Sequence, residues 1–164
     1  MSKEDSFLSD PHFQDVLLGF LVHDREFLAQ SSHMLIPADF GGMTKQSGPE
    51  RRVVAELALN FWNHYRQPVG KMLKVEVIEY ARKTGWKEEA KKRLLEYGDK
   101  LTSAKNKRVA PEAALRKVVQ YKTELELVRA LEMMQDQLDT GTLTMEEFLR
   151  IARTASEKVN GHED

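Results

Sequence analysis

Residues 111–138 read PEAALRKVVQYKTELELVRALEMMQDQL and predict one long helix. The only proline of this stretch stands first, where its missing N–H costs nothing and its fixed φ suits the first helical turn. Apolar residues recur every three or four positions, so they line one face of a helix. At about 1.5 Å per residue, the helix would be roughly 40 Å long. The apolar stripe consists of Ala114, Val118, Tyr121, Leu125, Val128, Leu131, Met134 and Leu138.

A second helix is expected directly after this one. The sequence Asp-Thr-Gly-Thr at 139–142 is a turn, and Thr144 with Glu147 three residues later makes a capping box. Leu143 and Phe148 form a hydrophobic staple around that cap. Two amphipathic helices joined by a short turn become antiparallel neighbours, so residues 111–159 are predicted to form a helical hairpin. The apolar side of the second helix carries Phe148, Ile151, Ala152, Ala155 and Val159.

The size and composition of the chain indicate one soluble globular domain. It has 164 residues, 41% of them hydrophobic, and no cysteine. The lack of cysteine excludes disulfides, thiolate nucleophiles and cysteine-bound zinc, and fits a reducing compartment. Residues 1–10 are polar and acidic, unlike a signal peptide, and no apolar run approaches the ~20 residues of a membrane span. We therefore expect a cytoplasmic protein with no membrane partner and a flexible N-terminus.

Charge is unevenly distributed along the chain. The net charge is −1, which argues against a nucleic-acid binder that works by overall charge. Residues 1–50 carry three basic and eight acidic side chains, and residues 132–164 carry the same numbers. Residues 82–108 carry ten basic and four acidic side chains. Such contrast can orient partners or copies of the chain, although a solvated, lysine-rich surface would have the same composition.

The region before the hairpin also predicts helices. Residues 11–110 contain apolar residues at helical spacing, interrupted at glycines, prolines and His23-Asp24. The run Leu35–Phe40 is expected to be a turn pinned to the core by Phe40. The fold class expected is all-α: a compact head of five to six helices at residues 11–110, then the C-terminal antiparallel hairpin at residues 111–159. Residues 160–164 would be a tail or the start of a linker.

Two details of the head are specific enough to test. In the helix that Pro49 opens, the buried stripe is predicted to be Val53, Val54, Leu57, Phe61 and Tyr65, with Trp62 at its border. A later helix is predicted over residues 86–97, with residues 98–110 as a basic, flexible connection to the hairpin.

No motif for catalysis is found in the sequence. Gly70-Lys71 is followed by Met72, where a phosphate-binding loop needs Ser or Thr. The five histidines have no partner at metal-ligand spacing, and no serine stands in a nucleophile elbow. Carboxylate pairs at predicted helix starts complement the helix dipole. We expect no catalytic site, no cofactor and no metal, so the chain alone would not be an enzyme.

One basic cluster could contact nucleic acid or a partner. Consecutive lysines and an arginine lie close to Trp86 in the sequence, and phosphate contacts with base stacking would use such residues. A short cluster without a motif is a weak signal, and a solvated helix face explains it equally well. The residues of this candidate patch are Lys91, Lys92, Arg93, Lys105, Lys107 and Arg108.

The order of several short segments resembles a known family. Val16-Leu17-Leu18-Gly19, then Asp24, then Leu35–Phe40 is similar to the opening of the N-terminal domain of bacterial and phage replicative hexameric DNA helicases of the DnaB type. Tyr65–Val69 is similar to the end of that domain's third helix. Residues 121–129, Gly141 and Thr144 are similar to its hairpin. The resemblance spans about residues 11–159, but the family's ATPase domain is absent and residues 82–108 match nothing in it.

The resemblance implies an assembly role in DNA replication. In the family this domain pairs through its hairpins, and the pairs form a three-fold collar, a trimer of dimers, above the motor ring. The collar belongs to the primosome, docks primase and, in some systems, a helicase loader, and direct DNA contact by this chain would be weak or absent. The hairpin seam and dimer face would use Leu125, Val128, Leu131, Met134, Leu138, Phe148, Ile151 and Ala155.

Several alternatives stay open at this stage. All eight hairpin residues could close the hairpin on itself without contacting a second copy. The chain could instead resemble the helicase-binding domain of primase, or be a small phage protein that binds a helicase or its loader and redirects it. The basic cluster leaves a nucleic-acid binder as a further alternative.

Overall fold

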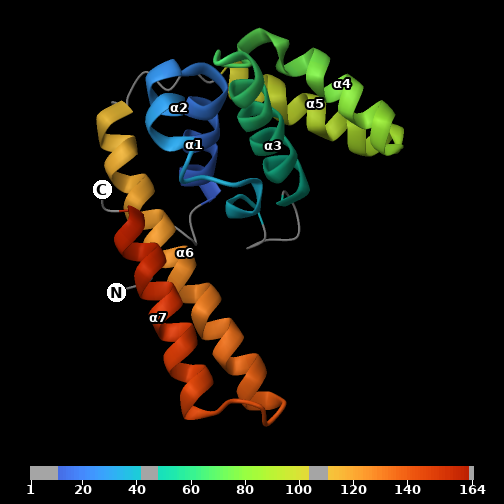
Figure 1. Cartoon of the computed structure of the whole chain (residues 1–164). Coiled ribbons are helices and arrows are strands. Elements are labelled where there is room, and N and C mark those ends of the chain that lie inside the picture. Colours follow the sequence, from blue (N-terminus) through green and yellow to red (C-terminus); the bar gives the residue numbers. More distant parts are fainter. Residues whose placement is uncertain (1–10, 42–47, 104–110, 163–164) are drawn as a thin grey trace. The chain divides into compact units, whose positions relative to one another are not determined.

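The computed structural model describes residues 11–41, 48–103 and 111–162. Over these ranges the fold is all-helical with no strand, which confirms the predicted class. Five α-helices come first, interspersed with two short 3-10 turns, and two further α-helices follow (Figure 1). The elements are α1 (Pro11–His23), α2 (Arg25–Ser31), η3 (Pro37–Asp39), α3 (Gly48–Tyr65), η4 (Gly70–Met72), α4 (Leu73–Thr84), α5 (Glu88–Ser103), α6 (Pro111–Asp139) and α7 (Met145–His162).

The structure divides into two compact units, and the division falls within α6. The N-terminal unit comprises residues 9–115, and the C-terminal unit contains residues 116–164. Within the N-terminal unit, α1 packs on α2, α3 and α5, while α4 packs on α3 and α5. Its core contains Leu17, Leu21, Phe27, Phe40, Val54 and Leu94, all with no exposed surface.

Local sequence signals set several boundaries of the N-terminal unit. Asp24 ends α1 and caps α2, because its Oδ1 accepts a hydrogen bond of 2.8 Å from the Phe27 backbone N–H. The backbone N–H of Ile36 donates to Asp39 Oδ2 at 2.9 Å and closes η3. Phe40 follows, fully buried, so the turn predicted at residues 35–40 is confirmed.

Helix α5 is longer than the sequence predicted. It continues through Gly98 to Ser103, where a flexible connection was expected from residue 98. Leu94 and Leu101 lie two turns apart on one face, and both are buried. A Cβ added at Gly98 would lie 3.4 Å from Leu73 Cδ2, an ordinary van der Waals contact, so Gly98 packs next to the first residue of α4. Tertiary packing therefore outweighs the low helix propensity of glycine here.

The buried face of α3 also differs from the prediction. Tyr65 is 58% exposed, whereas Trp62 is only 5% exposed. The face that packs inward carries small residues, and these let α3 approach its neighbours closely. Val53 and Val54 of the predicted stripe are buried, and the rest of the buried face consists of Arg51, Ala55, Ala58, Leu59 and Trp62.

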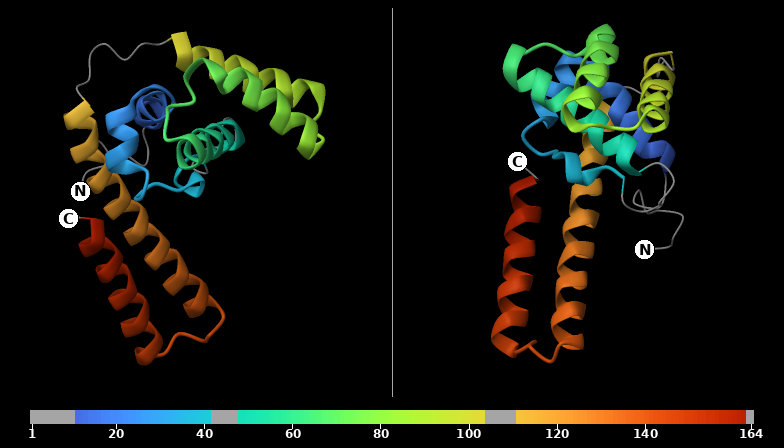
Figure 2. Two further views of the ribbon diagram at one scale, coloured as in Figure 1. Left: turned by 45° about the horizontal axis from the view of Figure 1, so that its top comes forward. Right: turned by 90° about the vertical axis from the view of Figure 1, so that its right-hand side faces the viewer.

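In the C-terminal unit, the residues of α6 from 116 onward and α7 run antiparallel (Figures 1 and 2). Gly141, with φ 72°, ends α6 in the left-handed region that glycine adopts easily. The N–H of Thr142 donates to the Gln137 carbonyl at 2.8 Å, and the N–H of Gly141 to the Leu138 carbonyl at 3.2 Å, as in a Schellman motif. The turn predicted at Gly141 is thus confirmed.

The N-terminal cap of α7 is also confirmed. The Glu147 backbone N–H donates to Thr144 Oγ1 at 3.1 Å. The Glu147 carboxylate accepts hydrogen bonds from Arg150 in its own helix and from Gln137 Nε2 of α6, the latter at 3.3 Å. Those bonds, first that from Arg150 and then that from Gln137, hold the pKa of the Glu147 carboxyl below its ordinary value. One side chain thereby supports the helix start and joins the two helices.

Candidate interaction surface

The two helices of the C-terminal unit enclose a narrow groove of about 70 Å³. Ile151 and Ala155 of α7 are buried and line it, and Ala130 and Met133 line it from α6. Of the eight hairpin residues singled out in the sequence, Ile151 and Ala155 are therefore brought together on the side of α7 that faces α6.

A buried carboxylate lies at one end of this groove. Only 8% of the Glu126 side chain is exposed, and cations surround it on both helices. Arg129 Nη1 lies 3.3 Å and Lys122 Nζ 3.9 Å from Glu126 Oε1, while Lys158 Nζ of α7 lies 3.6 Å from Oε2. Lys122 is itself buried. Lys122 and Arg129 belong to the same helix as Glu126, so only the Lys158 contact depends on the pairing of the two helices, and a shifted register would remove that one cation from a buried carboxylate.

The apolar residues of α6 do not form one stripe. Val118 and Tyr121 are fully buried, and Leu125 and Val128 continue their face half-buried. Residues 128, 131 and 134 of the predicted stripe are spaced three apart. An α-helix has 3.6 residues per turn, so each spacing of three shifts the stripe around the helix axis by about a sixth of a turn. Leu131, Met134 and Leu138 therefore lie on a different side of the helix from Val118 and Tyr121.

That second side of α6 is largely exposed. Leu127, Leu131, Met134 and Leu138 follow one another at spacings of four, three and four residues, the pattern of a coiled-coil seam. Leu131 is 64% exposed and Leu138 61% exposed, Leu127 is exposed, and Met134 is half-buried. Helix geometry places this row about a third of a turn away from the α6 residues that face α7.

Helix α7 contributes to the same side of the pair. Phe148, 42% exposed, and Ala152 precede Ile151 and Ala155 by three residues each and so lie about a sixth of a turn from them, with Met145 further around the helix. Because the helices are antiparallel, that rotation leads to the same side as the leucine row of α6. We call this surface the apolar face. It comprises Leu127, Leu131, Met134 and Leu138 of α6 with Met145, Phe148 and Ala152 of α7.

The structure describes only three of the six residues of the candidate basic patch. On α5, Lys92 and Arg93 are exposed and Lys91 is half-buried. Consecutive helical residues point in different directions, so the three do not share one face. Arg93 Nε lies 3.9 Å from Glu50 Oε1 of α3. The remaining residues of the candidate patch, Lys105, Lys107 and Arg108, lie outside the described residues.

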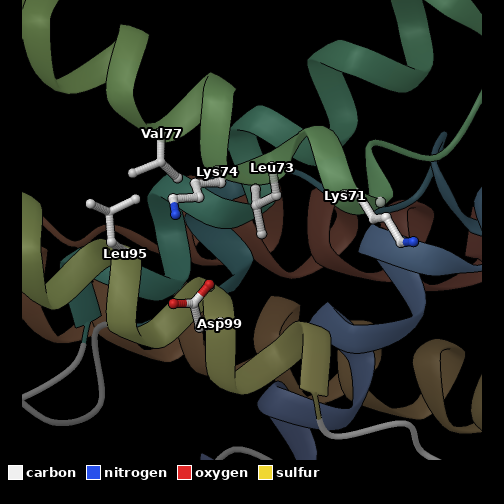
Figure 3. A pocket seen from close by; sticks show the side chains of 8 residues that line it. Lys71, Leu73, Lys74, Val77, Leu95 and Asp99 are labelled. Atoms are coloured by element: carbon white, nitrogen blue, oxygen red, sulfur yellow. The ribbon is translucent and has the colours of Figure 1, made fainter.

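A small cavity of about 140 Å³ lies between α4 and α5 (Figure 3). Leu73, Val77 and Leu95 form its apolar walls, and Lys74 of α4 and Asp99 of α5 stand on opposite sides of it. The cavity is close to the glycine contact between the two helices, and its few polar groups do not converge on one point. It offers space for a few atoms and no arrangement of catalytic groups.

Two kinds of site were sought among the described residues, a metal site and a membrane-spanning helix. Over residues 11–41, 48–103 and 111–162, no three histidine or acidic side chains lie close enough together to hold a metal ion. No helix in the same ranges is long and apolar enough to cross a bilayer.

Comparison with known proteins does not identify a family or a fold relative for this chain. No protein-family model, characterised protein or solved structure matches this chain.

Proposed function

We propose that this chain is a non-catalytic assembly and docking domain of the replicative-helicase type. In this proposal, residues 11–110 form a head and residues 111–159 a hairpin, and copies of the chain associate through the hairpin. The assembled copies would then present a docking surface to primase or to a helicase loader. The observation that carries the proposal is the apolar face of the C-terminal unit.

The apolar face supports self-association for two reasons. Single exposed apolar residues are common on proteins, but a continuous row of leucines with an aromatic beside it marks an interaction site. The heptad-like spacing of Leu127, Leu131, Met134 and Leu138 suits packing against another helix of the same kind. A second copy related by a two-fold axis is the simplest such partner, because each copy then covers the other with the same surface.

The charge distribution is compatible with docking of further proteins. Acidic side chains dominate residues 132–164, and basic ones dominate residues 82–108. Complementary fields of this kind speed association and fix its orientation more than they add affinity. The order of motifs described for the sequence supplies the helicase context, and the apolar face supplies the means of assembly.

The decisive experiment measures mass in solution. At micromolar concentration, sedimentation equilibrium of the wild-type chain should give a dimer or a multiple of it. Leu131→Asp should shift the mass to that of a monomer while the circular dichroism spectrum stays helical. Asp136→Lys, an exposed change on the same helix but more than a third of a turn from Leu131, is the matched control and should leave the assembly intact.

Two results would count against this proposal. A wild-type chain that is strictly monomeric at high micromolar concentration would favour a domain that docks onto a helicase made by another protein. Global unfolding of the Leu131→Asp variant would mean that Leu131 serves the core and not an interface.

A further inference from the structure

A second surface, distinct from the apolar face, lies within the N-terminal unit. A groove of about 570 Å³ runs between the second half of α3 and the first half of α4. This volume falls in the range of sites that hold small ligands or side chains of a partner. Its α3 wall carries Leu57, Phe61, His64 and Tyr65, and its α4 wall carries Glu76 and Glu79.

The α3 wall is aromatic and open to solvent. The ring centroids of Phe61 and Tyr65 lie 4.6 Å apart, and His64 meets the Tyr65 ring edge-on at 4.4 Å. Both neighbours hold the Tyr65 ring in place, yet Tyr65 is more than half exposed. A fixed aromatic ring with a free face attracts cations through its quadrupole.

The α4 wall is acidic. Glu76 is half-buried and Glu79 is exposed. Glu79 Oε1 lies 3.7 Å from Arg82 Nη2, but both side chains are well exposed, and a pair of this kind contributes little and exchanges readily. Lys83 follows Arg82, further along α4 than the two carboxylates. Carboxylates one turn apart therefore face the aromatic wall.

Groups near the groove between α3 and α4 add negative charge to it or keep positive charge away from it. Burial, and then the charge of Glu56 on α3, raise the pKa of Tyr80 on α4, so a third carboxylate acts between the same two helices. Arg66, which directly follows Tyr65, lies over the Trp62 ring at 5.9 Å. Trp62 is buried and does not line the groove. The cation next in sequence is thus turned away from the groove.

We propose that the groove between α3 and α4 binds an arginine- or lysine-bearing segment of a partner protein. The cationic group lies against the face of Tyr65 and pairs with Glu76 and Glu79, while its aliphatic stem packs on Leu57 and Phe61. Charge complementarity selects the occupant, because an acidic wall opposite an aromatic one favours guanidinium or ammonium groups over anionic or purely apolar ligands. This site is independent of self-association through the apolar face.

A labelled hexa-arginine peptide tests the proposal against the full chain, with fluorescence anisotropy as the readout. Glu76→Gln/Glu79→Gln should weaken binding by about tenfold, and Tyr65→Ala by about threefold, as expected for lost ion pairs and a lost cation–π contact at a partly exposed site. Tyr65→Phe keeps the ring and should bind as the wild type does. A hexa-glutamate peptide should not bind.

The matched control is Glu88→Gln/Glu89→Gln. It removes two exposed carboxylates from the first turn of α5, as the test variant removes Glu76 from the first turn of α4. Equal loss of peptide binding in both double variants would show attraction by overall charge only and overturn the proposal. Thermal melts of each variant establish that the folded protein is compared.

The same variants distinguish a second copy from a foreign partner. If Glu76→Gln/Glu79→Gln lowers the mass of the protein in the absence of peptide, another copy of this chain occupies the groove and the proposal is wrong. An unchanged mass together with the tenfold loss of peptide binding supports it.

Discussion

The hydroxyl of Tyr97 on α5 donates a hydrogen bond to Asp15 Oδ1 on α1, across 82 residues of sequence. The same oxygen accepts a bond of 3.0 Å from Arg51 Nε of α3, and the Arg51 guanidinium lies 5.8 Å from the centre of the Tyr97 ring. One carboxylate thus ties three helices together. Asp15 and Arg51 are both largely buried, so each group depends on the others for its stability.

Removal of the Tyr97 hydroxyl should weaken the N-terminal unit. Tyr97→Phe deletes a hydrogen bond to a buried charged group, which typically costs about 2 kcal/mol of the free energy of unfolding. Urea unfolding followed by circular dichroism measures the loss. Tyr65→Phe, which changes an exposed hydroxyl, should alter stability by less than about 0.5 kcal/mol. Equal effects of the two substitutions would contradict a structural role for the Asp15–Tyr97 bond.

The same bond predicts a dependence of stability on alkaline pH. Burial, followed by Asp15, raises the pKa of Tyr97 above its ordinary value of 10.0. Because the pKa is higher in the folded state, its contribution is fully present below pH 10 and is lost as the pH rises beyond that value. Above pH 10, the wild type should therefore lose stability with rising pH more steeply than Tyr97→Phe. Parallel slopes would show that Tyr97 is not the group responsible.

The charge on Glu126 should be essential to the C-terminal unit. Glu126→Gln removes the negative charge that Lys122, Arg129 and Lys158 surround, and breaking a buried charge cluster costs about 3 kcal/mol. Hydrogen exchange of the α6 and α7 amides should accelerate accordingly. Glu132→Gln, an exposed residue of the same helix, is the control and should leave exchange unchanged.

Acid pH should loosen the start of α7. The pKa of Glu147 lies below the ordinary 4.5, so its stabilising contribution is present above that value and is lost as the pH falls through the lower, folded-state pKa. Amide exchange of residues 145–150 should accelerate there in the wild type. Glu147→Gln should already show the faster exchange at neutral pH, with little further change on acidification.

The basic residues of α5 give a test of the nucleic-acid alternative. Because Lys91, Lys92 and Arg93 do not share a face, their change to glutamate should leave the affinity for single-stranded DNA weak and nearly unchanged at low salt. Loss of a strong, salt-dependent binding in that variant would instead assign the α5 surface to nucleic acid.

The sequence predicted local structure well where one signal acts within a few residues. The Schellman end at Gly141 and the Thr144 cap depend only on neighbouring backbone groups, and both were predicted correctly. The inward face of α3 was predicted only in part: Val53 and Val54 are buried as predicted, but the buried Ala55 and Ala58 were missed because alanines carry little apolar signal. Packing between distant helices decided that face.

The apolar face was only partly foreseen. The sequence correctly predicted that α6 is a helix. Its apolar residues 128, 131 and 134 follow one another at intervals of three, and each interval of three shifts the apolar stripe around the helix axis. Helical spacing alone did not reveal this shift. Leu131 and Leu138 therefore stand on the exposed side, whereas Ile151 and Ala155 are buried against α6. The aromatic and acidic groove of the N-terminal unit had no sequence signal at all, because Tyr65 was assigned to the core.

The connection between α6 and α7 fixes the rotation of one helix relative to the other. Hydrogen bonds of the Schellman motif and of the threonine cap hold the backbone between Leu138 and Phe148. One inserted residue would turn everything that follows by about 100° relative to α6 and carry Phe148 away from the leucines beside it. The length of this link should therefore be as intolerant of change as any buried side chain, and related chains that share the surface should differ there by substitution and not by insertion or deletion.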